Sequence, residues 1–105
     1  MSKVIDISAK LRNEPKFLMV SENKTYKVDD RKNTVLEINE LLGESGGTAE
    51  VMDKVIRKTL GDEAFREIEE MELSFDAYQS LFIGIMAAVQ NKTYEETEEA
   101  FRKAV

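Results

Sequence analysis

The sequence predicts an α+β fold that is mostly α, with a short N-terminal β-hairpin followed by about five helices in one compact domain. β-branched and aromatic residues are concentrated before residue 29, and from residue 30 onward the apolar residues recur at helical spacing. The chain has 105 residues, one proline and five glycines, which suits one largely helical domain. We therefore expect a single domain, 1–105, made of a strand or hairpin segment, 1–29, and a helical segment, 30–105.

The N-terminal residues allow two structures. Residues 3–8 alternate enough for a short strand, whereas Asp6 is placed to cap a turn or two of helix. Pro15 ends either element. After it, Phe17–Val20 and Thr25–Val28 are predicted to pair as a hairpin, with the residues Ser-Glu-Asn-Lys between them as a four-residue turn.

Each predicted helix carries start or stop signals. The residues expected to cap the helix starts are Asp30, Thr48, Asp62, Ser74 and Thr93. Thr93 also forms a capping box with Glu96, in which each residue can bond the backbone N–H of the other. Gly43 and Gly61 are expected to end the first two helices. The short third helix is expected to turn three apolar side chains inward: Phe65, Ile68 and Met71.

The predicted helix after Ser74 carries no charge over the fifteen residues Ala77–Asn91. Its nine-residue apolar run spans about 13 Å as a helix, against about 30 Å for a bilayer core, so a membrane span is not expected. Bulky side chains form a broad face that we expect to be core: Phe75, Tyr78, Leu81, Phe82, Ile85 and Val89. Small side chains form a narrow stripe: Ala77, Ser80, Gly84 and Ala88.

The small-residue stripe predicts a close contact. Gly84 costs about 1 kcal/mol relative to alanine in a helix interior, and the approach of another backbone would offset that cost. Ile83 and Ala87 lie beside the stripe. Either the domain itself encloses this helix, or part of its far face is covered by another subunit or a partner. The last helix, with Tyr94 and Phe101 on one side, can likewise dock on its own domain or on a neighbour.

The composition disfavours an enzyme. Cysteine and histidine are both missing, which removes thiolate chemistry, the commonest general base and the commonest transition-metal ligand. The pairs Glu63/Glu67 and Glu95/Glu99 could hold a cation or do acid–base work, but they are better explained as solvated acidic faces. Residues 43–48 resemble a phosphate loop only in their glycines. We therefore expect no catalytic residue, no cofactor and no metal site.

The charge distribution argues against nucleic acid as a partner. The net charge is −6, and residues 33–105 hold seven basic and sixteen acidic residues, whereas residues 1–32 hold eight and five. An acidic body repels phosphates, which supply most non-specific affinity for DNA. The predicted helices 31–42 and 48–60 also lack the short loop and the clean positive charge of a helix-turn-helix.

Two stretches resemble a known family. "YKVDDRKNTVLEINELL", 26–42, and "SFDAYQSLFIGIMAAVQNKTYEETEEAFRKA", 74–104, are similar to the tail assembly chaperones of long-tailed phages and prophages of Gram-positive bacteria. The shared features are a strand-forming N-terminus that ends in a "V-D-D-x-K-N" run, an aromatic-containing uncharged helix, and a final "T-x-E-E" helix.

The resemblance implies a non-enzymatic interaction function. Such proteins coat the tape-measure protein, keep it soluble in the cytoplasm of the bacterial host, and help to recruit tail-tube subunits. They also self-associate, and many have a frameshift-extended form, which here would continue past Val105. The residues to which this implies a partner-binding role are Ile83 and Ala87, expected on the exposed side of the uncharged helix, together with Gly84, Tyr94 and Phe101. Arg31 and Lys32 either meet acidic partner surfaces or are simply solvated. The alternative is a small phage-encoded regulator that binds DNA or a host protein.

Overall fold

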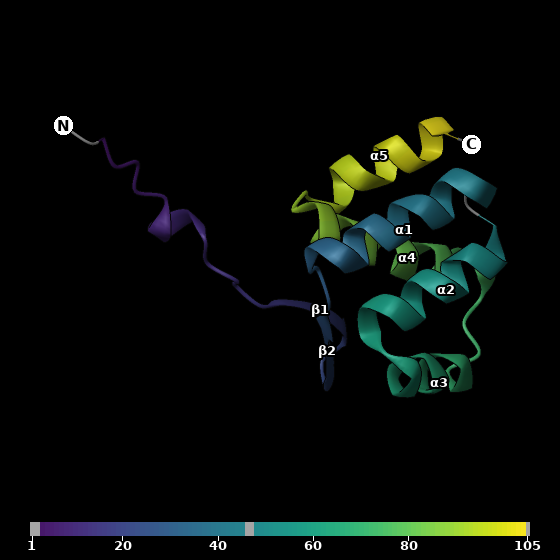
Figure 1. Ribbon diagram of the computed structural model, residues 1–105. Helices are drawn as coiled ribbons and strands as arrows, with labels where there is room; N and C mark the ends of the chain where they lie inside the picture. The colour runs from purple at the N-terminus through teal and green to yellow at the C-terminus, as the bar shows by residue number, and fades with distance from the viewer. Residues whose placement is uncertain (1–2, 46–47, 105) are drawn as a thin grey trace.

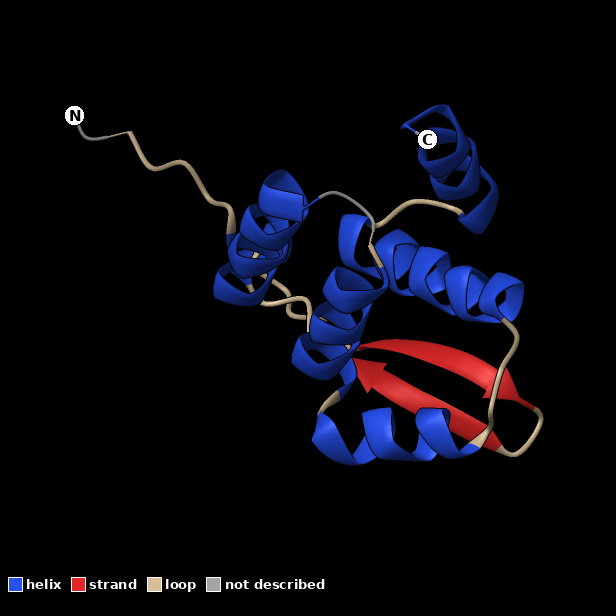
Figure 2. Cartoon of the chain, turned by 90° about the vertical axis from the view of Figure 1, so that its right-hand side faces the viewer, coloured by secondary structure: helices blue, strands red, loops and turns tan. Residues whose placement is uncertain are grey.

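The computed structural model describes residues 3–45 and 48–104 (Figure 1, Figure 2). Within these residues an antiparallel pair of strands precedes five α-helices, which confirms the predicted α+β, mostly α architecture. The strands are β1 (Lys16–Ser21) and β2 (Lys24–Val28). The helices are α1 (Lys32–Ser45), α2 (Ala49–Leu60), α3 (Asp62–Glu70), α4 (Phe75–Gln90) and α5 (Tyr94–Ala104).

Residues 3–15 form an arm that leaves the body of the molecule (Figure 1). Its only regular element among the described residues is a 3₁₀ turn, η1 (Ser8–Lys10). The N-cap of this turn is Ile7, so the cap predicted at Asp6 is wrong, and the alternative of a strand is not found either. Asp6 Oδ1 instead accepts hydrogen bonds from the Ser8 N–H at 3.0 Å and the Ser8 hydroxyl at 2.7 Å. The molecule measures 62 × 32 × 24 Å, and its radius of gyration is 15.8 Å against about 13 Å for a compact domain of this length.

The hairpin forms where it was predicted, but its turn is shorter. Ser21 pairs with Lys24, so the turn consists of Glu22 and Asn23 instead of four residues. The register shifts between Met19 and Ser21, which lets the strands continue to the tight turn. The strand prediction stopped at Val20 because polar residues follow it, whereas backbone pairing does not require apolar side chains.

Most helix ends follow their local signals. Thr48 accepts a hydrogen bond from the Val51 N–H, Ser74 accepts one from the Ala77 N–H, and Gly61 ends α2 with a φ of 97°. Thr93 and Glu96 bond each other reciprocally: the Thr93 N–H donates to Glu96 Oε1 at 3.0 Å, and the Glu96 N–H donates to Thr93 Oγ1 at 3.1 Å. These bonds confirm the predicted caps at Thr48, Ser74 and Thr93 and the capping box.

Three of the predicted helix starts and ends are wrong. Asp29, not Asp30, bonds the backbone at the start of α1, while Asp30 forms an ion pair with Lys16 at 3.2 Å. Gly43 lies inside α1, because glycine permits a helix end without enforcing one. Asp62 is the first residue of α3 and not its cap, since the Gly61 backbone already occupies the cap position.

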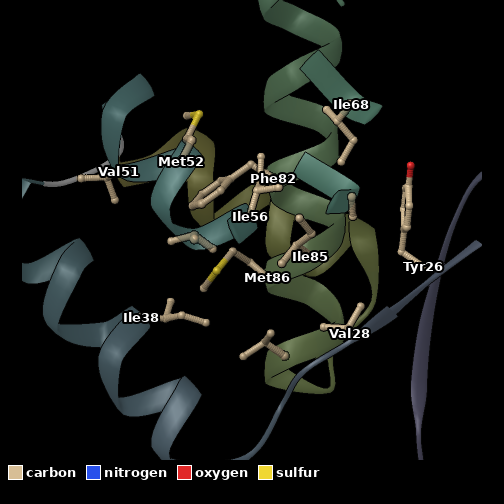
Figure 3. Close-up of a cluster of buried hydrophobic side chains, with 13 residues drawn as sticks. Tyr26, Val28, Ile38, Val51, Met52, Ile56, Ile68, Phe82, Ile85 and Met86 are labelled. Carbon is tan, nitrogen blue, oxygen red and sulfur yellow. The ribbon is translucent and has the colours of Figure 1, made fainter. Parts of the chain in front are cut away.

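The core is built around α2 and α4. Helix α4 contacts α5, α2 and both strands, and α2 also contacts α1 and α3. Ile85 and Met86 of α4 lie between Ile38 of α1 on one side and Val28 of β2 on the other (Figure 3). Ile68 of α3 and Phe82 of α4 belong to the same cluster, as do four side chains of α2: Val51, Met52, Val55 and Ile56. In the part of the chain that the structure describes, every buried side-chain nitrogen and oxygen has a hydrogen-bond partner.

Two side chains that were expected in the core are exposed. Met71 is the residue after the end of α3, and Phe75 is the first residue of α4. Both lie at the corner between these helices, where the chain turns away from the central cluster, and Phe75 is 56% exposed. Helical spacing selects a face along a helix, but it does not indicate where along its length packing stops.

Candidate interaction surfaces

Helix α4, which carries no charge from Ala77 to Gln90, is covered by its own chain over much of the surface that was expected to be free. Ile83 is 4% exposed and Ala87 is 6% exposed, so the expectation that they lie on an exposed side is wrong. The strands, α2 and α5 all pack on α4. Contact of Ile83 or Ala87 with a partner stays a prediction, and it would require the domain to open first.

Gly84 makes the close contact that its position predicts, but the contact is of a different kind. A Cβ atom at Gly84 would lie 3.1 Å from Leu18 Cδ1 of β1. The neighbour within the chain is therefore a side chain of the hairpin and not a backbone. Glycine at this point allows β1 to lie closely against α4.

The last helix docks on its own domain. The Phe101 ring of α5 lies 6.1 Å from the Phe82 ring of α4, centroid to centroid, with the ring planes tilted by 60°. This tilted geometry is favourable for aromatic pairs. Tyr94 is half-buried at the start of α5. Of the two arrangements left open for this helix, the intramolecular one is found.

One of the acidic pairs is used in the fold. Glu67 of α3 accepts a hydrogen bond from the Tyr26 hydroxyl at 2.8 Å and lies 2.9 Å from Lys24 Nζ. The bond from Lys24 lowers the pKa of Glu67. Burial and the bond to Glu67 raise the pKa of Tyr26 to about 12. Glu99 pairs with Lys103 at 3.1 Å. Among residues 3–45 and 48–104, no cluster of three or more acidic side chains is arranged to hold a metal ion.

Asp29 connects the hairpin to the helices. Its Oδ1 accepts from the Arg31 N–H at 3.1 Å, and its Oδ2 accepts from Arg31 Nη2 at 3.0 Å and from the Thr34 hydroxyl at 2.9 Å. Its own N–H donates to the Thr59 carbonyl at 2.8 Å. The bond from the Arg31 side chain is the largest influence on this carboxylate and lowers the pKa of Asp29 to about 2.

The low pKa of Asp29 predicts a pH-dependent effect of Asp29→Asn. A carboxylate with an ordinary pKa of about 3.9 when unfolded stabilises the fold above pH 4, and this contribution is lost as pH falls toward 2. We expect the variant to be about 1–2 kcal/mol less stable at pH 7, with the difference shrinking toward pH 2. Urea unfolding between pH 2 and 7 measures it. The exposed Glu40→Gln variant on α1 is the control, and a constant difference across this range would contradict the prediction.

The outer face of the hairpin is a surface that the sequence interpretation missed. Leu18 and Val20 point toward the helices, so Phe17 and Met19 point outward and are 59% and 70% exposed. Lys27 pairs with Phe17 across the strands. The signal was the unbroken apolar run in "KFLMVS", because a strand that is apolar at successive positions presents apolar side chains on both faces, and this hairpin buries only one.

Large apolar side chains are exposed in two further places. On the arm these are Val4, Ile5, Ile7 and Leu11. At the corner between α3 and α4 they are Met71, Leu73 and Phe75. Contiguous exposed apolar patches on a protein of this size commonly mark interaction sites, whereas isolated exposed residues need no explanation.

A basic cleft of about 1020 Å³ lies between the base of the arm, the hairpin and the start of α1. The ion pairs Lys16–Asp30 and Arg31–Asp29 lie within it, so Arg31 is engaged within the chain. Further cations line the cleft: Lys10, Arg12, Lys27 and Lys32. The excess of positive charge makes this cleft the part of the described surface best suited to an anionic partner.

Comparison of the chain with known families, curated proteins and solved structures gives no match to any of them. The candidate surfaces are therefore defined by their geometry and chemistry. Within the described residues, no helix has both the length and the apolar character needed to cross a bilayer.

Proposed function

We propose that the protein is a non-enzymatic tail assembly chaperone of a phage or prophage, and that it binds the tape-measure protein in the cytoplasm of the bacterial host and assists assembly of the tail tube. The observation that supports this best is the outer face of the hairpin. Phe17 and Met19 lie two residues apart on one strand face, largely exposed and held in place by the packing of β1 against α4. A pair of anchors on a rigid surface suits an amphipathic helix of a long helical client.

The charge of the chain fits the same function. With a net charge of −6, the protein stays soluble while one apolar face is occupied by a client, and so can carry an aggregation-prone partner in solution. Lys27 beside Phe17 adds a cation at the edge of the apolar face, where it could pair with an acidic side chain of the client. Within the part of the chain that the structure describes, Lys32 is exposed and forms no ion pair, so both of its expected roles, partner contact and solvated residue, stay predictions.

Co-expression with a long helical tape-measure protein tests this proposal. Wild-type chain should keep the client soluble and co-purify with it at moderate salt, because apolar contact dominates. The double variant Phe17→Ser/Met19→Ser should bind at least tenfold more weakly, since each truncated anchor loses about 1–2 kcal/mol. Leu36→Ser is the control, because Leu36 is 52% exposed on α1, away from this face. Equal binding by the hairpin variant, or an insoluble client with wild-type chain, would contradict the proposal.

A second candidate is a phage-encoded regulator that binds DNA, and the basic cleft favours it. Binding of duplex DNA there should fall steeply between 50 and 200 mM salt, roughly 10-fold or more, as bound counterions are released. The Lys10→Gln/Lys32→Gln variant should weaken it further. Client binding through the hairpin face should depend neither on the salt concentration nor on Lys10 and Lys32. Titrations with both ligands at two salt concentrations therefore separate the two functions. If the regulator instead binds a host protein, duplex DNA should not bind to the chain. The same hairpin variants then test binding of that host protein.

A further inference from the structure

We propose that the arm of one copy, residues 3–15, docks in an apolar groove at the α3–α4 corner of a second copy of this chain. This surface is distinct from the outer face of the hairpin, and the inference does not depend on the proposed function. It rests on the exposed side chains of the arm, on the groove, and on the opposite charges of the two.

The arm exposes several large apolar side chains, as a segment that binds another surface does. Val4, Ile5, Ile7 and Leu11 are exposed, and Val4 is 85% exposed. Their exposure is costly in water, because burying one such side chain contributes about 1.5–3 kcal/mol. The bonds from Ser8 to Asp6 shape the middle of the arm into a defined turn, so part of the ordering needed for docking is already present.

The groove lies where α3 ends and α4 begins and has a volume of about 250 Å³. Ile68, Leu73 and Phe75 supply its apolar lining, and Tyr78 lies at the α4 side with its hydroxyl bonded to the Asp53 carboxylate. Ala49, Glu69 and Glu72 complete the lining. The groove thus combines an apolar floor with acidic edges.

The charges of the arm and the groove are complementary. The segment 69–76 contains four acidic residues and no basic one: Glu69, Glu70, Glu72 and Asp76. The arm with its base contains an excess of cations: Lys3, Lys10, Arg12 and Lys16 against Asp6 and Glu14. An extended apolar segment with basic side chains therefore fits an apolar groove with acidic edges, and complementary potentials also favour the correct pairing over other contacts.

The position of the arm favours a second copy over the chain's own groove. The arm leaves the body on the side opposite to the connection between α3 and α4, in both views (Figure 1, Figure 2). To reach its own groove the arm would have to reverse at Pro15, whose ring fixes φ, and cross the body. Docking on a neighbour needs no such reversal.

Sedimentation velocity on the full chain, between about 1 and 100 μM, tests the proposal. Wild-type chain is expected to self-associate in this range. Ile5→Ser/Leu11→Ser on the arm and Leu73→Ser/Phe75→Ser in the groove should each weaken association at least tenfold, while Leu36→Ser should not. These are exposed or half-exposed positions, and circular dichroism checks that each variant folds. A wild-type chain that is monomeric throughout, or variants that associate like wild type, would overturn the proposal.

Charge reversal identifies the pairing of the two surfaces. Lys10→Glu/Arg12→Glu and Glu69→Lys/Glu72→Lys should each abolish association alone, because like charges then face each other. An equimolar mixture of the two variants should associate, since each arm then meets a groove of opposite charge. A mixture that stays monomeric would overturn this pairing. Client binding through Phe17 and Met19 should survive in both variants, so this test and that of the proposed function fail independently.

Cross-linking separates docking on a neighbour from docking within one chain. The chain has no cysteine, so single cysteines report without background. A mixture of Leu11→Cys and Leu73→Cys chains should form a disulfide-linked heterodimer on mild oxidation. A chain with both substitutions that forms only an internal disulfide, and stays monomeric, would show that the arm occupies its own groove and would overturn the proposal.

Discussion

Replacing Phe82 by alanine is expected to lower the free energy of unfolding by about 3–5 kcal/mol. Phe82 is 3% exposed, belongs to the central cluster, and packs its ring against Phe101 of α5. The substitution therefore leaves a cavity beside α2 and also removes the aromatic contact that holds the last helix. For a domain whose total stability is about 5–15 kcal/mol, this is a large fraction.

Phe75→Ala is the matched control for this loss. It removes the same atoms from the same helix, but Phe75 is 56% exposed, so at protein concentrations at which the chain is monomeric we expect a cost below about 1 kcal/mol. Guanidinium unfolding followed by circular dichroism compares the two variants with wild type. Similar losses would mean that α4 is not packed with Phe82 inward, and the assignment of its buried face would be wrong.

Replacing Gly84 by leucine is expected to destabilise the protein by about 1–3 kcal/mol. The added side chain would collide with Leu18, whose Cδ1 lies 3.1 Å from the position of a new Cβ, and would push β1 away from α4. The gain from replacing glycine in a helix offsets less than about 1 kcal/mol of this cost. Because the obstacle is the end of a side chain, the Leu18→Ala background should relieve much of it.

A double-mutant cycle measures this coupling. The cost of Gly84→Leu should fall by at least about 1 kcal/mol when Leu18 is alanine. Gly43→Leu provides a control of opposite sign, since Gly43 lies within α1 and a Cβ there would meet no atom within 4 Å, so leucine should stabilise by up to about 1 kcal/mol. If the effects of Leu18→Ala and Gly84→Leu on the free energy of unfolding are additive, the steric explanation is wrong.

The helix ends were predictable because their signals are local. Thr48, Ser74 and the Thr93–Glu96 capping box act within three residues of sequence, and each forms the expected bonds. Asp29 and Asp30 show the limit of such signals. Both are acidic residues before α1, and only the path of the chain between β2 and α1 decides which one reaches the helix start.

The interaction surfaces were less predictable, for a different reason. Helix α4 is apolar on nearly all sides, so its periodicity could not indicate which side is covered by β1 and α5, and Ile83 was assigned to the exposed side. Exposure on the arm and on the hairpin depends on what fails to pack against them. That is a property of the whole fold. The exposed face of the hairpin was partly predictable, because the four successive apolar residues 17–20 place apolar side chains on both faces of the strand.

The dependence of the hairpin on α4 also has a consequence for synthesis of the chain. An isolated two-stranded hairpin is at best marginally stable in water, and the surface that covers its inner side is complete only when Gln90 has been made. At about 5–20 residues per second, β1 and β2 wait roughly 3–12 s for that helix on the ribosome. Throughout this delay the run Phe17–Val20 is an exposed, β-prone segment, and the charges of Lys16, Glu22 and Lys24 at its margins are placed to keep nascent chains apart.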